Sequence, residues 1–466
     1  MRREILRLAV PAFLALVAEP LFLLADAAIV GHLGTEPLAA LGVASSILIT
    51  AAGLFVFLAY GTTSVVARRL GAGDERGAVA AGVDGLWLSL GLGALTAVVV
   101  AVAAPALCAA VGGSAGVQEQ ASTYLRLSAL GLPGMLVVLG ATGLLRGLQD
   151  TTTPLVVAIG GFGANIALNL ALVYGAGLGI AGSAIGTVLA QTGMAIALVV
   201  TVLSKALRLG APLSPHTAGI LSAAIGGIPL LVRTLALRGV ILSTTVVAAR
   251  YGDTVLAAQQ IVATVWNGLA FALDALAIAA QAITGKALGA AEIGQARSAA
   301  ATMARWGIGA GAVTGVVLVP LAPVIGRAFT PDPAVVSAAA WAFVVVALME
   351  WLAGFVFVVD GVLMGAGDTV WLAVAMALAG VVWVPVTLWA SAGGQVLPGG
   401  FGQPLAGLWV WFGGGFMALR AVGLWWRFRA DSWLVTGATR SLGRERPVRP
   451  AYPVRRGARH PRAVLG

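Results

Sequence analysis

The stretch GLLRGLQDT at residues 143–151 returns 218 residues later as GVLMGAGDT at 361–369. At the same offset, LGAGD at 70–74 returns as LGAAE at 288–292. Landmarks that keep one register over such a distance predict an internal repeat, in which one structural unit is built twice along the chain.

The composition of the chain is typical of a membrane protein. Of its 466 residues, 59% are hydrophobic and only 10% are charged, whereas a water-soluble domain carries about 25% charged residues. Breaks at charges, glycines and prolines divide the chain into about twelve apolar runs, each of roughly 20 residues, which suffices to cross a bilayer as a helix. Strand-like alternation is absent, so we predict an all-α integral membrane protein.

Each copy of the repeat holds about six of these runs, an even number, so both copies insert in the same orientation. We therefore predict two six-helix lobes related by a parallel internal repeat. The predicted boundaries are 1–205 for the N-terminal lobe, 206–219 for a cytoplasmic linker, 220–430 for the C-terminal lobe and 431–466 for a basic, disordered cytoplasmic tail. The alternative for this Pro- and Arg-rich tail is attraction to anionic lipid.

Basic residues gather in alternate loops, which the positive-inside rule assigns to the cytoplasm together with both termini. They are Arg2, Arg3, Arg7, Arg68, Arg69, Arg76, Arg146, Lys205, Arg208, Lys286, Arg297 and Arg305. Arg250 and Arg327 fall on the opposite side. Residues 430–466 supply +6 of the net charge of +10, which argues against a nucleic-acid partner. The excess of arginine over lysine, 26 to 2, suggests a GC-rich bacterial source and hence a cytoplasmic membrane.

Two carboxylates interrupt the first apolar run. Asp26 lies within FLLADAAIVGHLG at 22–34, and Glu19 precedes it by seven residues. A bare carboxylate in mid-membrane costs several kcal/mol, so such groups face a cavity, pair or become protonated, and burial favours the neutral acid. Seven residues make nearly two helical turns, so we expect both acids to look into one cavity as ion-coupling groups. The alternative for either acid is a structural hydrogen bond.

Five longer stretches together carry a family resemblance. They are ILRLAVPAFLALVAEPLFLLADAAIVGHLGTEPLAALG at 5–42, ARRLGAGD at 67–74, LLRGLQDTTTP at 144–154, GIAGSAIGTVLAQ at 179–191 and FALDALAIAAQAITGKALGA at 271–290. In this order they resemble the multidrug and toxic compound extrusion (MATE) family, in particular its DinF-like branch. The resemblance implies a cation-coupled antiporter that exports bulky, often cationic organic compounds by alternating access. We expect a monomer whose partners are a small organic substrate and membrane lipids, with no cofactor and with H⁺, or alternatively Na⁺, as the transported ion.

Further polar residues of the first lobe are candidates for the same ion-coupling site. Asn165 and Asn169 are i and i+4 and share one helical face, and the resemblance adds Tyr124 and Thr187, which fit positions lining the first-lobe site in archaeal-type relatives. Relatives commonly have aspartate where this chain has Asn169, and its loss favours protons over sodium. Relatives often have an amide where this chain has Glu19. This additional acid could replace the carboxylate missing at position 169, so sodium stays an alternative. The alternative for the asparagines is helix-to-helix hydrogen bonding.

Pro11 lies inside the first run, 15 residues before Asp26, and the repeat matches it to Pro229. Proline removes a backbone hydrogen bond and permits a kink. The resemblance suggests that bending of this helix accompanies protonation of the acid. Alternatively, Pro11 simply opens the helix near the interface.

The second lobe contains its own charges within apolar runs. Arg233 and Arg238 lie in RTLALRG and need counter-charges, for which the available acids are Asp274, Glu350 and Asp360. Three acids against two arginines leave one carboxylate free to titrate, which suggests a second coupling or substrate site. A purely structural ion-pair cluster is the alternative.

Other functions fit the sequence less well. An integral-membrane enzyme should show clustered histidines or an Asp-rich motif, but the chain has only three histidines and one cysteine, so neither catalytic residues nor a metal site is expected. A two-lobe repeat with titratable groups suits a carrier better than a channel. A flippase for lipid-linked or other amphipathic molecules is the closest alternative. Such flippases tend to have a strongly cationic cavity, whereas only Arg233 and Arg238 are clearly intramembrane here.

Overall fold

The computed structural model describes residues 2–400 and 402–438, and this part of the chain is helical without strands. The first half comprises α1 (Arg2–Gly31), α2 (Thr35–Leu54), α3 (Phe57–Gly71), α4 (Glu75–Val111), α5 (Ala115–Ala129), α6 (Leu132–Gly147), α7 (Thr152–Leu170), η1 (Ala171–Gly175) and α8 (Gly179–Leu209). The second comprises α9 (Thr217–Arg250), α10 (Asp253–Gly289), α11 (Ile293–Phe329), α12 (Pro333–Gly365), α13 (Thr369–Ala390), η2 (Ala392–Gly394), α14 (Pro404–Trp411), η3 (Phe412–Met417), α15 (Ala418–Arg429) and η4 (Asp431–Trp433).

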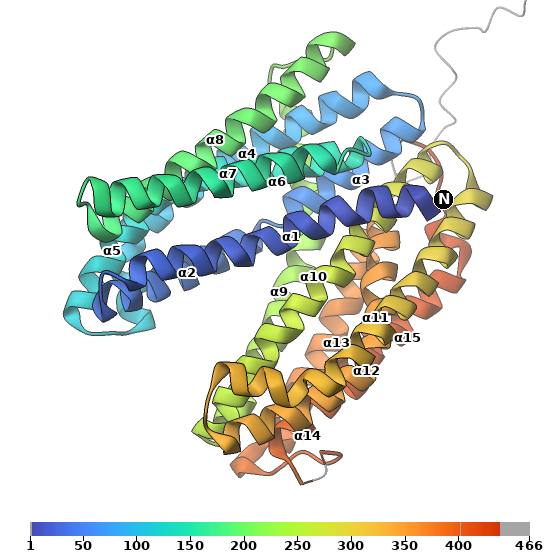
Figure 1. Ribbon diagram of the computed structural model, residues 1–466. Helices are drawn as coiled ribbons and strands as arrows, with labels where there is room; N and C mark the ends of the chain where they lie inside the picture. Colours follow the sequence, from blue (N-terminus) through green and yellow to red (C-terminus); the bar gives the residue numbers. More distant parts are fainter. Residues whose placement is uncertain (1, 401, 439–466) are drawn as a thin grey trace, which may run out of the picture.

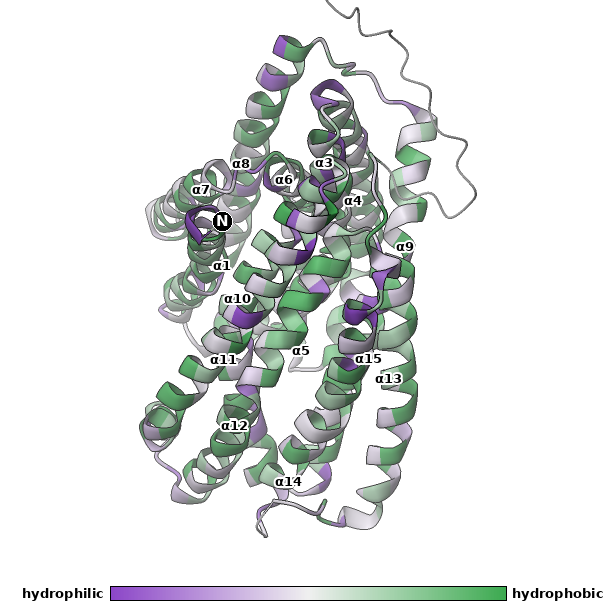
Figure 2. Ribbon diagram, turned by 90° about the vertical axis from the view of Figure 1, so that its right-hand side faces the viewer, coloured by the Kyte–Doolittle hydropathy of each residue, from purple (hydrophilic) through white to green (hydrophobic). Residues whose placement is uncertain are grey.

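These helices confirm the predicted all-α membrane architecture. Within the described residues, eleven helical spans are long and apolar enough to cross a bilayer, with α2 and α3 counted as one span and α14, η3 and α15 as another. The pair α5 and α6, bent by 49° at their junction, makes a twelfth candidate. Hydrophobic residues run along most of the length of the helices in both lobes (Figure 2). Many of their leucines and valines are exposed, as expected for helices whose outer faces contact lipid rather than water.

The helices form two bundles, α1–α8 and α9–α15, arranged as a V (Figure 1). The bundles converge at the end that bears the N-terminus, called here the proximal end, and diverge toward the opposite, distal end. The repeat is visible in the helix bounds: α3 and α10 end at Gly71 and Gly289, and α6 and α12 end at Gly147 and Gly365. The predicted pair of lobes related by a parallel repeat is therefore confirmed.

Glycines bring the two lobes into backbone contact at the proximal end. A Cβ atom on Gly71 of α3 would lie 1.9 Å from the carbonyl oxygen of Lys286, and one on Gly289 of α10 would lie 2.0 Å from that of Arg68. Small residues permit this close approach of helices in a bilayer. Because both glycines belong to the repeated LGA motif, the same sequence feature in each copy forms one half of the contact.

The segment after the last span departs from the sequence prediction. Residues 431–438 are folded against the proximal end, with Trp433 only 1% exposed, so the prediction that the chain is disordered from residue 431 is wrong for these eight residues. The rest of the predicted tail, 439–466, lies outside the described residues. The predicted linker is shorter than expected, since α8 continues to Leu209 and α9 begins at Thr217.

We expect Gly71→Val to destabilise the protein by about 1–3 kcal/mol, a typical cost of overpacking, because the new side chain meets the backbone of α10. Denaturation in detergent measures this change. Gly91→Val is the matched control, since Gly91 is a helical glycine and a Cβ atom there would have no neighbour within 4 Å. Equal stability of the two variants would contradict the close contact.

Candidate functional site

Asp26 is enclosed within the first lobe, between α1, α5, α7 and α8. Asp26 is only 4% exposed. Its Oδ1 atom accepts hydrogen bonds from Asn169 Nδ2 at 2.8 Å and Ser183 Oγ at 2.7 Å, and its Oδ2 atom accepts one from the Tyr124 hydroxyl at 3.4 Å. All three donors are neutral, and no ion pair to Asp26 is found among the described residues. The carboxylate is therefore desolvated and hydrogen-bonded, but its charge is not cancelled by a nearby cation.

The hydrogen bonds continue from Asp26 through the amides of α7 to α8. Asn169 Nδ2 also donates to Asn165 Oδ1 at 2.9 Å, and Asn165 Nδ2 donates to Thr187 Oγ1 at 3.1 Å. Asn169 Oδ1 is buried without a hydrogen-bond partner. A Cβ atom on Gly186 would lie 2.1 Å from that oxygen, so glycine is required for α8 to approach α7 here. The network thus holds one unused acceptor in a tightly packed site.

The structure brings five predicted residues of this lobe together, namely Asp26, Tyr124, Asn165, Asn169 and Thr187. It adds Ser183, which was not predicted from the sequence. The signal was present, because Ser183 lies in the quoted stretch GIAGSAIGTVLAQ four residues before Thr187, and residues i and i+4 share one helical face.

Glu19 does not belong to this network. It is exposed, and no hydrogen bond to its side chain is found within residues 2–400 and 402–438. Glu19 and Asp26 therefore do not share one hydrogen-bond network, and their facing one cavity stays a prediction. Seven residues of helix rise about 10 Å, so the packing that covers Asp26 does not extend to Glu19.

Pro11 lies inside the long helix α1 rather than at its start. Because proline has no backbone N–H, the carbonyl of Arg7, four residues earlier, loses its partner within the helix. Thr151 Oγ1 donates to that carbonyl at 3.4 Å. The interruption in α1 is thus compensated from the loop between α6 and α7, which belongs to the repeated DT motif.

Charged residues of the second lobe form a smaller ion-pair group than predicted. Asp360 Oδ2 accepts from Arg233 Nη2 at 2.6 Å and also from Arg420 Nη2. The side chains are 5%, 13% and 6% exposed, in the order Asp360, Arg233 and Arg420. The guanidinium of Arg420 also lies over the ring of Phe416, 5.6 Å from its centroid. Two arginines therefore hold this one carboxylate.

The other three members of the predicted cluster are not ion-paired with Asp360. Arg238 is exposed and points across to α2, where a Cβ atom on Gly53 would lie 2.6 Å from its Nη2 atom. Asp274 accepts a hydrogen bond from the Tyr60 hydroxyl of the first lobe at 2.8 Å, and it interacts electrostatically with both Arg233 and Asp360. Glu350 has no ion pair among the described residues. Asp274 is therefore a neighbour of the ion-pair group, whereas Arg238 and Glu350 form no ion pair with it.

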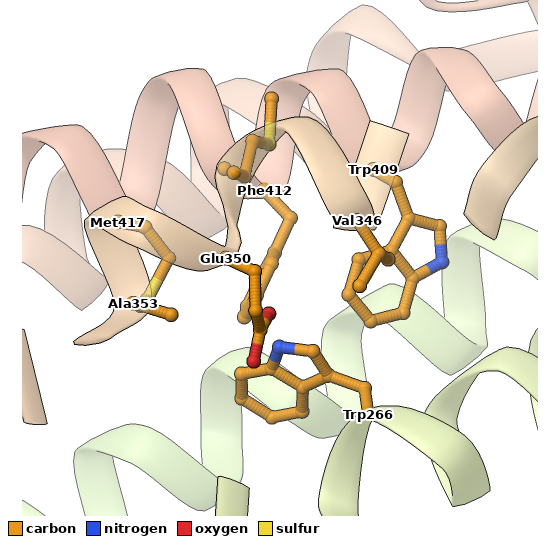
Figure 3. Close-up of a pocket in the computed structure, with 9 residues that line it drawn as sticks. Trp266, Val346, Glu350, Ala353, Trp409, Phe412 and Met417 are labelled. Atoms are coloured by element: carbon orange, nitrogen blue, oxygen red, sulfur yellow. The ribbon is translucent and has the colours of Figure 1, made fainter. Parts of the chain in front are cut away.

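Glu350 instead lines a small pocket inside the second lobe. It is 1% exposed, and its Oε1 atom has no hydrogen-bond partner. Aromatic rings of Trp266, Trp409 and Phe412 surround it, with ring centroids 5.3–6.0 Å apart, and its carboxylate lies beside the indole of Trp266 (Figure 3). The free space is about 10 Å³, which is room for one water-sized group.

A π-helical turn lies near Asp26 and another near Glu350. The turn Ala171–Gly175 begins two residues after Asn169, and the turn Phe412–Met417 contributes Phe412 and Met417 to the Glu350 pocket. Such turns are rare and occur frequently at functional sites.

In the described part of the chain, no group of three or more histidine, cysteine or acidic residues could hold a metal ion.

The sequence model of the MatE family matches residues 11–171 and 229–389, more than half of the chain. The chain belongs to the MATE family of multidrug efflux transporters. The two matched segments of this MATE transporter begin 218 residues apart, the same offset as the repeat.

Individual relatives agree with this family assignment. Protein DETOXIFICATION 44, chloroplastic, of Arabidopsis thaliana is 32% identical over 450 residues, which cover 92% of this chain and 83% of the relative. DNA damage-inducible protein F of Escherichia coli is 31% identical over 290 residues, covering 61% of this chain and 63% of the relative. A solved MOP superfamily transporter from Pyrococcus furiosus superposes with a TM-score of 0.82 at 23% identity, covering 92% and 96% of the two chains, so this MATE transporter shares its fold.

We expect Asp360→Asn to destabilise the protein by about 3–5 kcal/mol, because it leaves two buried guanidinium groups without their counter-charge. Glu350→Gln is the control, since Glu350 has no ion pair to lose in the described structure. Urea denaturation in detergent compares the two variants. An Asp360 variant as stable as the Glu350 variant would show that the pair is not the principal electrostatic contact of the lobe.

Proposed function

We propose that this MATE transporter is a proton-coupled antiporter that exports bulky, often cationic organic compounds. The observation that carries the proposal is the state of Asp26, which is 4% exposed and bonded only to neutral donors. Burial in low dielectric favours the neutral acid, whereas hydrogen bonds to the anion favour the charged form. These opposing effects allow the carboxylate to gain or lose a proton when the proton concentration around it changes.

Asp360 shows by contrast why Asp26 is the better coupling group. Two guanidiniums bond to Asp360, so adding a proton there would leave two buried positive charges facing a neutral acid. Adding a proton to Asp26 would instead remove the only formal charge from its network. Asn169 Oδ1, buried and without a partner, provides an acceptor within that network.

The donor pattern supports protons rather than sodium as the coupling ion. Sodium ions in transporters are held by carbonyl and carboxylate oxygens. In this network Asp26 is the one carboxylate, and the other members are amides and hydroxyls. A site with a single carboxylate among neutral groups suits a proton on that carboxylate.

The arrangement of the lobes supports alternating access across a bacterial cytoplasmic membrane. The predicted cytoplasmic arginines and lysines, including Arg68 and Lys286, lie at the ends of helices that meet at the proximal end. We infer that the proximal end and both termini are cytoplasmic, which makes this an outward-facing conformation. Asp26 lies in the distal half of α1, so its proton would come from outside. Pro11 is the candidate hinge for bending α1 when that proton binds.

Glu350 is the candidate second proton site. It is a buried acid of the second lobe with no ion pair in the described structure, and its Oε1 atom has no hydrogen-bond partner. The walls of its pocket are aromatic rings and thioethers, which offer a sodium ion few oxygen ligands. A proton on Glu350 would instead leave a neutral side chain in an apolar pocket.

The flippase alternative would require a strongly cationic cavity. The structure adds Arg420 to the buried arginines of the second lobe but does not make such a cavity. Arg233 and Arg420 share Asp360, so this group carries a net charge of only +1. Assays of lipid-linked oligosaccharide translocation and of cationic dye export, run on the same reconstituted protein, separate the two functions. Translocation without dye export would favour the flippase.

We expect Asp26→Asn to fold but to lose at least about tenfold of its dye efflux, as expected when an essential proton carrier is removed. The measurement is cationic dye transport in inverted vesicles with proton and sodium gradients imposed separately. Asp253→Asn, an exposed acid at the distal start of α10, should transport normally. Efflux at the wild-type rate by Asp26→Asn would refute the proposal, and efflux driven only by sodium would overturn the choice of ion.

Glu350→Gln should reduce the number of protons released when substrate binds, because one of two protonatable carboxyl groups is lost. A pH-indicator dye added to weakly buffered, detergent-solubilised protein reports this release. Asp253→Asn provides the comparison, since Asp253 is an exposed acid that does not line the pocket of Glu350. Unchanged release in the Glu350 variant would remove Glu350 from the mechanism without affecting the role of Asp26.

A further inference from the structure

The proximal end must open and close during transport by alternating access. In this structure it is closed by contacts between the lobes near Gly71 and Gly289 and by polar side chains. Ser64 Oγ donates to the carbonyl of Met364 at 2.7 Å, and Gln149 Nε2 donates to that of Ala282 at 3.1 Å. Every such bond between lobes has to break when substrate is taken up from the proximal side.

Arg68 is more buried than Ser64 or Gln149 and also reaches across to the second lobe. It belongs to α3 of the first lobe, and the residue is only 2% exposed. Its Nη1 atom donates to the carbonyl of Ala366 at 3.1 Å, and its Nη2 atom donates to the carbonyl of Val435 at 2.7 Å. Both acceptors belong to the second lobe or to the segment that follows it. A buried guanidinium therefore depends on backbone oxygens that are present only while the lobes are together.

Val435 is held in place by attachments on either side. Trp433, 1% exposed, stacks on Phe428 with ring centroids 5.8 Å apart, and its Nε1 atom donates to the Phe428 carbonyl at 3.0 Å. Beyond Val435, the backbone N–H of Gly437 donates to the carbonyl of Leu288 at 3.1 Å. Asp431 is in addition paired with Arg297 of α11. All of these anchors belong to the second lobe, so the segment moves with it.

We propose that residues 431–438 form a latch that holds the proximal end closed by capturing Arg68 of the opposite lobe. The latch has a fixed side, where Trp433 and Gly437 attach it to α15 and α10. It has one releasable side, the bond between Arg68 and Val435. Because the acceptor is a backbone carbonyl, a particular side chain at position 435 is not required for capture.

The physical basis of the latch is the exchange of solvent for carbonyl oxygens. Hydrogen bonds made by a charged group contribute more than neutral ones, but on opening the guanidinium recovers water as a partner. The net difference between the states is then modest, which suits a contact that breaks in every cycle. Weakening the latch should increase the population of the proximally open state without altering the Asp26 network.

The test measures the distance between the lobes at the proximal end by pulsed electron–electron double resonance. Spin labels are placed at Arg76→Cys and Gln295→Cys, exposed positions at the starts of α4 and α11. The background is Cys108→Ala, which removes the only native cysteine. We expect Arg68→Gln to raise the ratio of long to short distances by about tenfold, the effect of losing hydrogen bonds from a charged group.

Arg69→Gln is the matched control, because Arg69 donates to the carbonyl of Gly77 within its own lobe. It should leave the distance distribution unchanged. Trp433→Ala should shift the distribution in the same direction as Arg68→Gln, and the double variant should add little, as for residues acting through one contact. A shift in Arg68→Gln but not in Trp433→Ala would overturn the latch, because Arg68 would then act on closure without residues 431–438. The absence of a shift in both variants would overturn it as well.

Discussion

A charge inside a lipid-embedded protein must be satisfied by the protein itself, and this chain does so in two different ways. Asp360 forms ion pairs with Arg233 and Arg420, which join α9, α12 and α15. Asp26 receives hydrogen bonds from neutral side chains alone. The first arrangement places cations beside the carboxylate, and the second does not. In the function proposed above, this difference distinguishes the structural acid Asp360 from the coupling acid Asp26.

The same constraint shapes the contact between the lobes. At the proximal end the helices approach through glycines, so that backbone lies against backbone and carbonyl oxygens are available as acceptors. Ser64, Arg68 and Gln149 use such oxygens from the opposite lobe. Apolar side chains also join the lobes here, since Ile5, Leu8 and Ala9 of α1 belong to one buried cluster with residues of α10. Family membership, the V-shaped arrangement and these reversible contacts are consistent with one another.

Much of the fold could be predicted because it depends on local patterns. Apolar run lengths fixed the number of spans, and the 218-residue offset of the two DT and LGA motifs fixed the pair of lobes. Helical periodicity was also sufficient to place Asn165 beside Asn169. It was insufficient for Glu19, because sharing a face of α1 with Asp26 does not mean sharing the neighbours that cover Asp26. Enclosure depends on which other helices pack at each level.

The sequence by itself determined that this chain spans the membrane as two copies of one unit and that Asp26 is an acid within the first apolar run. Only the tertiary structure decided the partners of each charge: Arg420 joins Asp360 across 60 residues, Tyr60 reaches Asp274 from the other lobe, and residues 431–438 pack instead of hanging free. The reason is geometric. Sequence spacing fixes the direction of a side chain relative to its own helix, whereas the rotation and crossing of separate helices decide which side chains meet.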